Sequence, residues 1–373
     1  MSWGHAVSSD LLHWEHLPVA IGCDETYGIF SGSAVIDLKN SSGFGSLENP
    51  PMVAIYTAHN HDGSHQSQHI AYSLDEGVTW TKYADNPVLD LGMKDFRDPK
   101  VTYEEATNTW LMTVAKPQDF KISFFRSSDL KNWEHLSDFG PLGATGGCWE
   151  CPDLFPLEID GVTKWVLLVS LNPGGYSGGS GTQYFIGHWD GKTFTPDSTN
   201  TRWIDYGRDN YAGVTFNNHP EGKRIFLGWM SNWIYADKIP TELWRSSMTL
   251  PREITLRKLD GEISLISTPL DPGSEVVRTQ LHITQGADSS LTFKDEKNFL
   301  TIAFDSATSE VVITRSWFIE DSPQRSLPIT SESATLSIYF DNGSCELFSP
   351  EIGLTMTSLS LVTLDGARVT HQS

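Results

Sequence analysis

The chain has 373 residues, of which 39% are hydrophobic, so it holds enough apolar material for a large core and intrinsic disorder is disfavoured. Its 26 basic and 47 acidic side chains give a formal net charge of −21, which argues against nucleic-acid binding and against attraction to an anionic membrane. Four cysteines in so long a chain cannot form a disulfide framework.

Short apolar runs bounded by Gly, Pro, Asn and Asp recur along the chain and predict β-strands. Clear examples lie at residues 52–57, 110–114, 165–171 and 224–229. No stretch keeps a 3.6-residue period over three turns, and no apolar run approaches the ~20 residues that a membrane span needs. The first residues lack the basic start and apolar segment of a signal peptide. We therefore predict an all-β protein without a membrane partner.

A short pattern repeats in the first part of the chain. Residues 8–14, 73–80 and 127–133 each run from Ser through Asp to Trp, and 188–194 is a weaker copy that ends in Phe. Asp suits a tight turn because its carboxylate accepts bonds from backbone N–H groups further along. Repeats of this size in an all-β chain favour the blades of a β-propeller. Chance hairpins in a sandwich are the alternative.

The composition changes after about residue 257, where Trp becomes rare and Ser and Thr become common. We predict a propeller domain over 1–257, a linker over 258–273 that includes Asp-Pro-Gly-Ser at 271–274, and a small β-sandwich over 274–373. The expected sandwich strands include 299–304, 311–314, 336–340 and 345–348.

Two acidic residues stand out as candidates for catalysis. Asp98 follows Arg97, and Glu150 lies between Trp149 and Cys151, and a proline that we expect to end a strand ladder comes shortly after each acid. Desolvation beside Trp and Cys favours the protonated form that a general acid needs, whereas Arg97 is expected to keep Asp98 ionised. Such an acidic pair suits cleavage of a glycosidic bond. In the alternative interpretation, Arg97 and Asp98 form an ion pair at a turn and Glu150 caps a strand.

These residues belong to a set of blocks through which the chain resembles the family-32 glycoside hydrolases, the β-fructofuranosidases. The blocks are Trp-Gly-His-Ala-Val-Ser (3–8), Phe-Ser-Gly-Ser (30–33), Phe-Arg-Asp-Pro (96–99), Trp-Glu-Cys-Pro-Asp (149–153), Asp-Asn-Tyr-Ala (209–212) and Gly-Trp-Met-Ser-Asn-Trp (228–233). They follow the family's order and cover nearly all of residues 1–257. The resemblance implies a five-bladed β-propeller followed by a β-sandwich.

The resemblance also implies roles for individual residues. Glu150 corresponds to the general acid/base and Asp98 to the stabiliser of the oxocarbenium-like transition state. The substrate-binding residues that it implies are Phe30, Ser31, Arg97, Asp209, Tyr211 and Trp233, with Trp3 and Trp149 as further candidates for sugar contact. Asn210 replaces the family's Phe, which affects local packing. No metal or organic cofactor is implied.

The family's nucleophile is an Asp in an Asn-Asp-Pro block upstream of the Trp-Gly-His-Ala block. Asp-Pro occurs in this sequence only at 98–99 and 271–272, so the nucleophile is absent from this chain. We therefore expect the first blade to keep only its last two strands, because Trp-Gly-His-Ala lies at the start of the chain, and we expect the chain as given to be weakly active or inactive. This predicts that it belongs to a longer parent protein.

Three other patterns have weaker functional interpretations. Cys148 and Cys151 lack the second pair that a zinc site needs. The histidines at 59, 61, 65 and 69 are typical of a polar loop rather than a metal site. The glycine-rich segment 174–181 has no basic residue and no following helix, so we predict a mobile loop instead of a phosphate cradle.

The function that the resemblance implies is release of terminal β-D-fructofuranosyl units from fructans (levan or inulin) and from sucrose by a retaining mechanism. A sucrose-specific invertase, an inactive fructan-binding relative and a propeller scaffold for a protein partner are the alternatives. An extracellular or periplasmic location is the family expectation.

Overall fold

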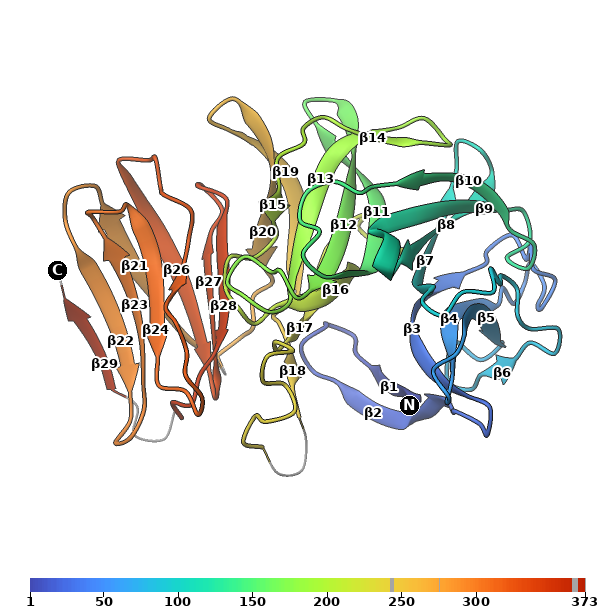
Figure 1. Cartoon of the computed structure of the whole chain (residues 1–373), viewed down its shortest axis with the longest axis horizontal. Helices are drawn as coiled ribbons and strands as arrows, with labels where there is room; N and C mark the ends of the chain where they lie inside the picture. The colour runs from blue at the N-terminus through green and yellow to red at the C-terminus, as the bar shows by residue number, and fades with distance from the viewer. Residues whose placement is uncertain (242–244, 275, 364–367, 373) are drawn as a thin grey trace. The chain divides into compact units, whose positions relative to one another are not determined.

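The computed structural model describes residues 1–241, 245–274, 276–363 and 368–372, and its regular structure is almost entirely β (Figure 1). Within these ranges there are 29 strands and one three-residue 3-10 helix, η1 (Pro117–Asp119). No helix in the described part of the chain is long and apolar enough to cross a membrane. The prediction of an all-β protein is confirmed.

The chain forms two compact units. Unit 1 comprises Met1–Leu157, Val162–Ser170 and Tyr184–Thr201, and unit 2 comprises Glu158–Gly161, Leu171–Gln183 and Arg202–Ser373. Each unit has its own buried apolar clusters.

Unit 1 is built from antiparallel sheets whose strands follow one another in chain order. The first sheet has two strands, β1 (Trp3–Val7) and β2 (Glu15–Ile21). The others have the orders β3 (Tyr27–Ile36), β4 (Met52–Asn60), β5 (Gln66–Ser73), β6 (Thr81–Lys82); β7 (Arg97–Glu104), β8 (Thr109–Lys116), β9 (Lys121–Ser127), β10 (Glu134–Phe139); and β11 (Cys148–Ile159), β12 (Val162–Asn172), β13 (Gly181–Trp189), β14 (Phe194–Pro196). The apolar runs predicted at 52–57, 110–114 and 165–171 lie in β4, β8 and β12.

The repeated Ser-to-Trp pattern forms the same turn three times in unit 1, between β1 and β2, β5 and β6, and β9 and β10. In the second copy, Ser73 Oγ donates to Asp75 Oδ1 (2.7 Å), the same oxygen accepts the backbone N–H of Thr79 (2.9 Å), and Trp80 Nε1 donates to the carbonyl of Gly77 (2.8 Å). Asp10 and Asp129 make the corresponding serine and backbone contacts in the other two copies. The sequence repeat is therefore a structural repeat.

Unit 2 contains three antiparallel sheets. They are β16 (Tyr211–Thr215), β17 (Ile225–Met230), β19 (Arg252–Leu259), β20 (Glu262–Pro269), with β18 (Ser247–Met248) beside β17; β21 (Val277–Thr284), β26 (Ser333–Asp341), β27 (Ser344–Ser349), β28 (Leu354–Leu359); and β25 (Gln324–Arg325), β24 (Glu310–Arg315), β23 (Phe299–Asp305), β22 (Ser289–Lys294), β29 (Arg368–Gln372). The short strand β15 (Arg202–Trp203) also belongs to this unit. The run predicted at 224–229 is β17, and the four predicted sandwich strands are β23, β24, β26 and β27.

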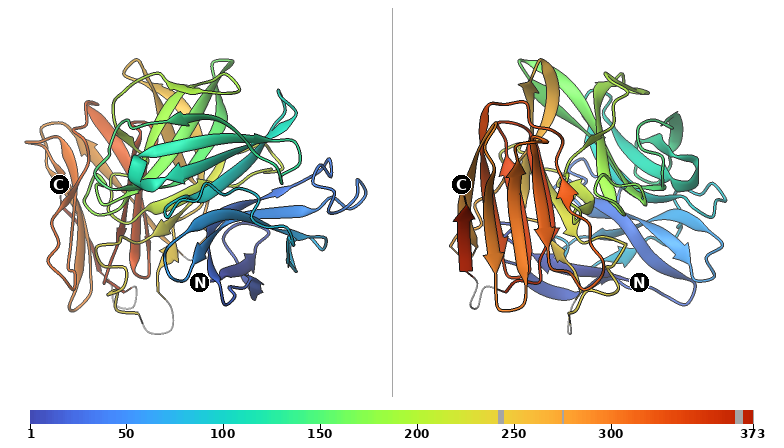
Figure 2. Two further views of the ribbon diagram at one scale, coloured as in Figure 1. Left: turned by 45° about the vertical axis from the view of Figure 1, so that its right-hand side comes forward. Right: turned by 60° about the vertical axis from the view of Figure 1, so that its left-hand side comes forward.

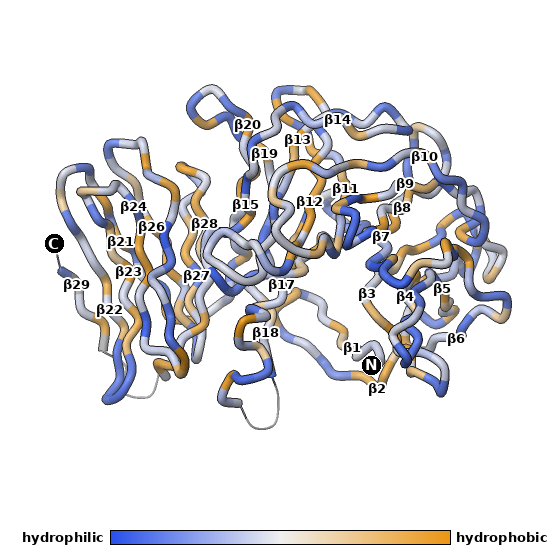
Figure 3. The backbone as a smooth tube through the Cα atoms, viewed as in Figure 1, coloured by the Kyte–Doolittle hydropathy of each residue, from blue (hydrophilic) through white to orange (hydrophobic). Residues whose placement is uncertain are grey.

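The last two sheets of unit 2 pack face to face as a β-sandwich (Figures 1 and 2). Along β26, apolar and polar residues alternate (Figure 3). In both β23 and β26, buried positions alternate with more accessible ones, so one face of each strand is buried. At the centre, the rings of Phe293 and Phe340 stack at 4.3 Å between centroids.

The predicted linker is largely not a linker. Residues 252–269 form the β19–β20 hairpin, in which Leu259 pairs with Glu262 and Arg252 pairs with Pro269. Composition alone missed this hairpin because most residues around its turn, from Arg257 to Glu262, are polar and accessible. The division of the chain into propeller and sandwich domains stays a prediction.

Candidate active site

The two candidate acids lie near the starts of β7 and β11, where the backbone is irregular. The pairing of β7 with β8 shifts between Arg97 and Lys100, and Asp98 in this bulge has φ +65°, while Cys151 after Glu150 has φ +48°. Asp tolerates this left-handed conformation better than most residues, and bulges beside active sites re-aim side chains. Each proline lies inside a strand next to its irregularity, so our expectation that proline ends the ladder was wrong.

The Phe-Ser-Gly-Ser block forms a similar bulge in β3, between Ile29 and Gly32. A Cβ atom on Gly32 would lie 2.0 Å from the carbonyl oxygen of Ile55 on β4, so only glycine permits this close approach of the two strands. The bulge leaves Phe30 half-buried and Ser31 exposed.

Asp98 and Glu150 lie side by side in unit 1. Asp98 Oδ2 accepts the backbone N–H of Cys151 at 3.0 Å, which places it next to the residue that follows Glu150. Arg97 holds Glu150 through Nε and Nη2, each 3.0 Å from Oε1, and its Nη1 bonds Asp95 at 2.8 Å. The two acids thus share one cationic neighbour and one backbone segment.

Burial and the charge of Glu150 raise the pKa of Asp98 to about 6, although Arg97 works in the opposite direction. Arg97 thus favours the ionised form of Asp98, as expected, but its effect is outweighed, because the guanidinium bonds Glu150 and Asp95 while Asp98 is only 6% exposed. Burial lowers the pKa of Arg97, but the negative charges of Glu150 and Asp98 outweigh it and raise that pKa overall.

A second layer of polar side chains supports the acids, and our sequence analysis did not single it out. Gln66 Oε1 accepts the backbone N–H of Phe96 (2.9 Å) and faces Arg97 Nη1 (3.4 Å), and Gln66 Nε2 lies 3.1 Å from His59 Nδ1. The His59 ring stacks on Phe30 at 4.3 Å between centroids. This layer therefore joins the Arg97 cluster to the predicted sugar-contacting ring of Phe30.

A parallel set of contacts fixes the backbone of Asp98. Its N–H donates to Thr57 Oγ1 (3.0 Å), Thr57 donates to Gln68 Oε1 (2.8 Å), and Gln68 Nε2 donates to the carbonyl of Phe96 (2.7 Å). Thr57 and Gln68 are cross-strand partners on β4 and β5, as are His59 and Gln66. The available signal was polar residues two apart along otherwise buried strands.

The remaining predicted site residues belong to unit 2. Trp233 is 55% exposed, and its ring centroid lies 5.1 Å from that of Trp229. Tyr211 is buried and contacts Trp229 edge-on.

The position of Asp209 requires a correction. Its carboxylate is fully buried and bonds Arg315 (2.8 Å), the backbone N–H of Leu359 (2.8 Å) and the hydroxyl of Tyr235. Both oxygens are engaged inside the protein, so Asp209 has a structural role and direct contact with a substrate is not compatible with this arrangement. The Trp149 ring is also fully buried, so it supports the site from the core.

The structure also shows the surroundings of the histidines and of the glycine-rich segment. Within the ranges that the structure describes, no group of three or more His, Cys, Asp or Glu side chains could hold a metal ion. His61, His65 and His69 each bond a protein group instead. The glycine-rich segment is tied by hydrogen bonds to Asn232 and Arg208, which contradicts the prediction of a mobile loop.

Comparisons with known proteins show the family to which the chain belongs. The family model for the glycosyl hydrolases family 32 N-terminal domain matches residues 1–269. The levanase of Bacillus subtilis is 39% identical over 97% of this chain, and an extracellular exo-inulinase of Aspergillus niger is 42% identical over 74% of it. The chain spans 60% and 58% of the lengths of these two relatives.

Solved structures give the same result. The exo-inulinase of Aspergillus awamori superimposes with a TM-score of 0.88 at 32% identity, covering all of this chain and 87% of the other. The fructofuranosidase of Schwanniomyces occidentalis, solved with fructose, gives a TM-score of 0.87 at 33% identity, covering all of this chain and 86% of the other. Matching blocks, matching fold and the paired acids lead to one conclusion: the chain belongs to glycosyl hydrolase family 32.

Proposed function

We propose that this chain recognises terminal β-D-fructofuranosyl units of fructans and of sucrose, and that, together with the family's nucleophile block, it releases them by a retaining mechanism. The observation that carries the proposal is the direct juxtaposition of Asp98 and Glu150, joined through Cys151 and Arg97. In retaining glycosidases the acid/base and the nucleophile lie about 5–5.5 Å apart. Asp98 is not that nucleophile, so the retaining mechanism is inferred from the family.

Glu150 fits the role of general acid/base. Its side chain is 22% exposed, so it can reach a bound sugar, while Arg97 holds one of its oxygens in place. It would protonate the leaving oxygen and afterwards activate water. Asp98, which is almost buried beside it, would accept hydrogen bonds from fructosyl hydroxyls and stabilise the positive charge that develops on the sugar.

Phe30, Ser31 and Trp233 fit the role of sugar-contacting residues, because each remains accessible in its own unit. Tyr211 would act by packing against Trp229. No metal or organic cofactor is part of the proposal.

The architecture and location of the protein are also inferred. The two-stranded β1–β2 sheet and four sheets with four-stranded main paths suit a five-bladed propeller with an incomplete first blade, followed by the sandwich. We propose an extracellular or periplasmic location, since the matched exo-inulinase of Aspergillus niger is described as extracellular.

The first test measures the binding of a fructan trisaccharide to residues 1–373 by titration calorimetry. We expect Asp98→Ala to weaken binding at least tenfold, because the carboxylate contacts to the sugar are lost. Unchanged affinity contradicts the assignment of Asp98. In a version of the chain that is extended by an Asn-Asp-Pro nucleophile block, Glu150→Gln is expected to slow fructose release from inulin, levan or sucrose by about 10²–10⁴-fold.

A second candidate is fructan binding without hydrolysis. It is favoured by the lack of an Asn-Asp-Pro block anywhere in the 373 residues. Binding of the trisaccharide by this chain with no detectable fructose release supports this candidate for the chain itself, and turnover by purified residues 1–373 excludes it. Relative rates on sucrose and inulin separate a sucrose-specific invertase from a fructan hydrolase.

A further inference from the structure

Trp233 is an exposed ring between two buried anchors in unit 2. Its indole is 55% exposed, whereas Asn232 before it and Tyr235 two residues after it are completely buried. Its backbone N–H donates to Ser180 Oγ at 3.1 Å. The orientation of this ring therefore depends on what holds the two anchors.

Asn232 is the first anchor, and its side chain bonds backbone groups of unit 2. Its Oδ1 accepts the backbone N–H of Ile234 at 3.1 Å, which forms an Asx turn around Trp233. Its Nδ2 donates to the backbone carbonyl oxygens of Gly178 (3.1 Å), Ser180 (3.4 Å) and Arg208 (2.9 Å). The Trp233 turn is thus fixed to the glycine-rich loop and to the backbone of Arg208.

Gly179 makes this contact possible. It has φ +66°, and a Cβ atom there would lie 2.0 Å from Asn232 Oδ1. Any larger residue must displace the Asn232 side chain. The glycine-rich segment is therefore a docking surface for Asn232.

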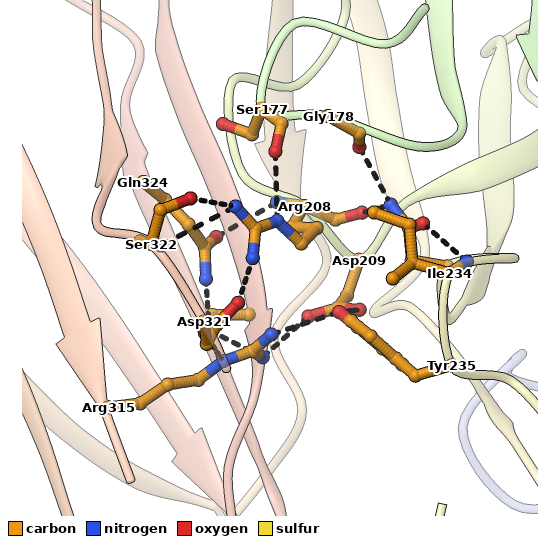
Figure 4. Close-up of polar contacts among 12 residues, drawn as sticks. Ser177, Gly178, Arg208, Asp209, Ile234, Tyr235, Arg315, Asp321, Ser322 and Gln324 are labelled. Carbon is orange, nitrogen blue, oxygen red and sulfur yellow. Dashed lines mark hydrogen bonds and ion pairs between the residues drawn. The ribbon is translucent and has the colours of Figure 1, made fainter. Parts of the chain in front are cut away.

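Arg208 connects the first anchor to the C-terminal β-sandwich segment. Its guanidinium bonds the carbonyl of Ser177 (2.8 Å), Ser322 Oγ (3.0 Å) and the carboxylate of Asp321 (Figure 4). Asp321 lies between β24 and β25 and is itself buried at the side chain.

Tyr235, the second anchor, leads to the same aspartate. Its hydroxyl bonds Asp209 and accepts from Arg315 Nη2 at 2.9 Å, and Arg315 Nε donates to Asp321 Oδ2 at 2.7 Å. One carboxylate oxygen of Asp321 bonds Arg208 and the other bonds Arg315. The contacts that hold both sides of the Trp233 turn therefore converge on Asp321.

We propose that Asp321, a residue of the β-sandwich segment, is a positioning residue for Trp233 and acts through Arg208–Asn232 on one side and Arg315–Tyr235 on the other. The part of the inference that concerns sugar binding rests on the proposed function of Trp233. Replacing the carboxylate by an amide leaves two buried guanidinium groups with one negative partner, Asp209, so the network must rearrange. The Trp233 turn is the exposed end of that network, so we expect it to move.

The experiment measures Trp233 by two independent routes. The first route is acrylamide quenching of Trp233 fluorescence. The Trp233 signal is the difference between the fluorescence of each protein and that of the same protein carrying Trp233→Phe. We expect Asp321→Asn to change that quenching constant at least twofold and to weaken binding of the fructan trisaccharide about tenfold. Gly179→Ala, which alters no charge, is expected to do the same by displacing Asn232.

Two matched controls separate positioning from general damage. Glu310→Gln removes an accessible ion-pair partner of Arg325 in the same sandwich, and Gly286→Ala introduces the same positive-φ strain at a site where a Cβ meets no atom within 4 Å. Both should leave Trp233 quenching unchanged. If Asp321→Asn does not fold, the comparison of Trp233 quenching in Gly179→Ala and Gly286→Ala decides whether the contacts through Asn232 position Trp233.

The outcomes are distinct. Unchanged Trp233 quenching in folded Asp321→Asn overturns the proposal. Unchanged quenching in Gly179→Ala shows that the contacts through Asn232 do not position Trp233. Altered quenching with unchanged sugar affinity supports the positioning role and counts instead against Trp233 as a sugar-contacting residue.

Discussion

Arginine–carboxylate clusters occur in both compact units, and their different burial indicates different uses. In unit 2, the side chains of Arg315 and Asp209 are completely buried and their charges are matched by direct partners. In unit 1, Arg97 and Glu150 remain 13% and 22% exposed, and the pKa of their neighbour Asp98 is raised to about 6. A buried cluster in which every charge is paired stabilises the fold. A partly exposed cluster that includes an acid with a raised pKa is suited to chemistry.

The strongest test of this comparison is Arg315→Met in unit 2. The substitution leaves Asp209 and Asp321 without one of their cationic partners in a buried site, so we expect it to lower the free energy of unfolding by about 3–5 kcal/mol. Urea denaturation measures the effect.

The control for that experiment is Arg325→Met in the same sandwich. Arg325 is 45% exposed and pairs with Glu310, so its loss is expected to cost under about 1 kcal/mol. Equal effects of the two substitutions would contradict the structural role of the buried cluster.

A stabilising effect is expected from Asp98→Asn in unit 1. The pKa of Asp98 rises from 3.8 to about 6 on folding, so the folded chain binds this proton more tightly than the unfolded chain does. The stability of the native protein therefore falls as pH rises from about 4 to 6, by on the order of 3 kcal/mol for this group at full ionisation. Asparagine removes that penalty and still accepts the Cys151 N–H.

We therefore expect Asp98→Asn to be more stable than the native sequence by about 1–3 kcal/mol at pH 7.5 and equally stable below pH 4. Thermal or urea unfolding of both proteins across this pH range measures the difference. A variant that is less stable at pH 7.5 would show that the carboxylate is stabilised by its surroundings rather than strained by them.

Local patterns in the sequence predicted much of the fold, and long-range contacts explain what they missed. Short apolar runs bounded by turn-forming residues predicted the strands, and the Ser-to-Trp pattern predicted the turns, because both depend on residues close in sequence. Asp98 and Glu150 were placed together by resemblance alone. The burial of Asp209 depends on Arg315, which is 106 positions away, and no local pattern indicates such a partner.

The same reason explains why the sequence did not show how far the pKa of Asp98 is raised. Arg97 is adjacent to Asp98 in sequence, but its guanidinium bonds Glu150, 53 positions away, and Asp95. Gln66 and His59 were missed because their importance arises only once β4 and β5 pair.

The smallest effect is expected where contacts are local, in the repeated turns of unit 1. Asp75→Ala removes the bonds that Asp75 accepts from Ser73 and Thr79 at an exposed turn, so we expect only a small loss in the free energy of unfolding. Asp129→Ala should cost a similar amount, and the two effects should add, since each aspartate bonds residues of its own turn. Urea denaturation of the two single variants and the double variant tests this. A loss in the double variant far above the sum would mean that the turns cooperate across sheets, and the contrast between local turns and long-range buried clusters would then need to be redrawn.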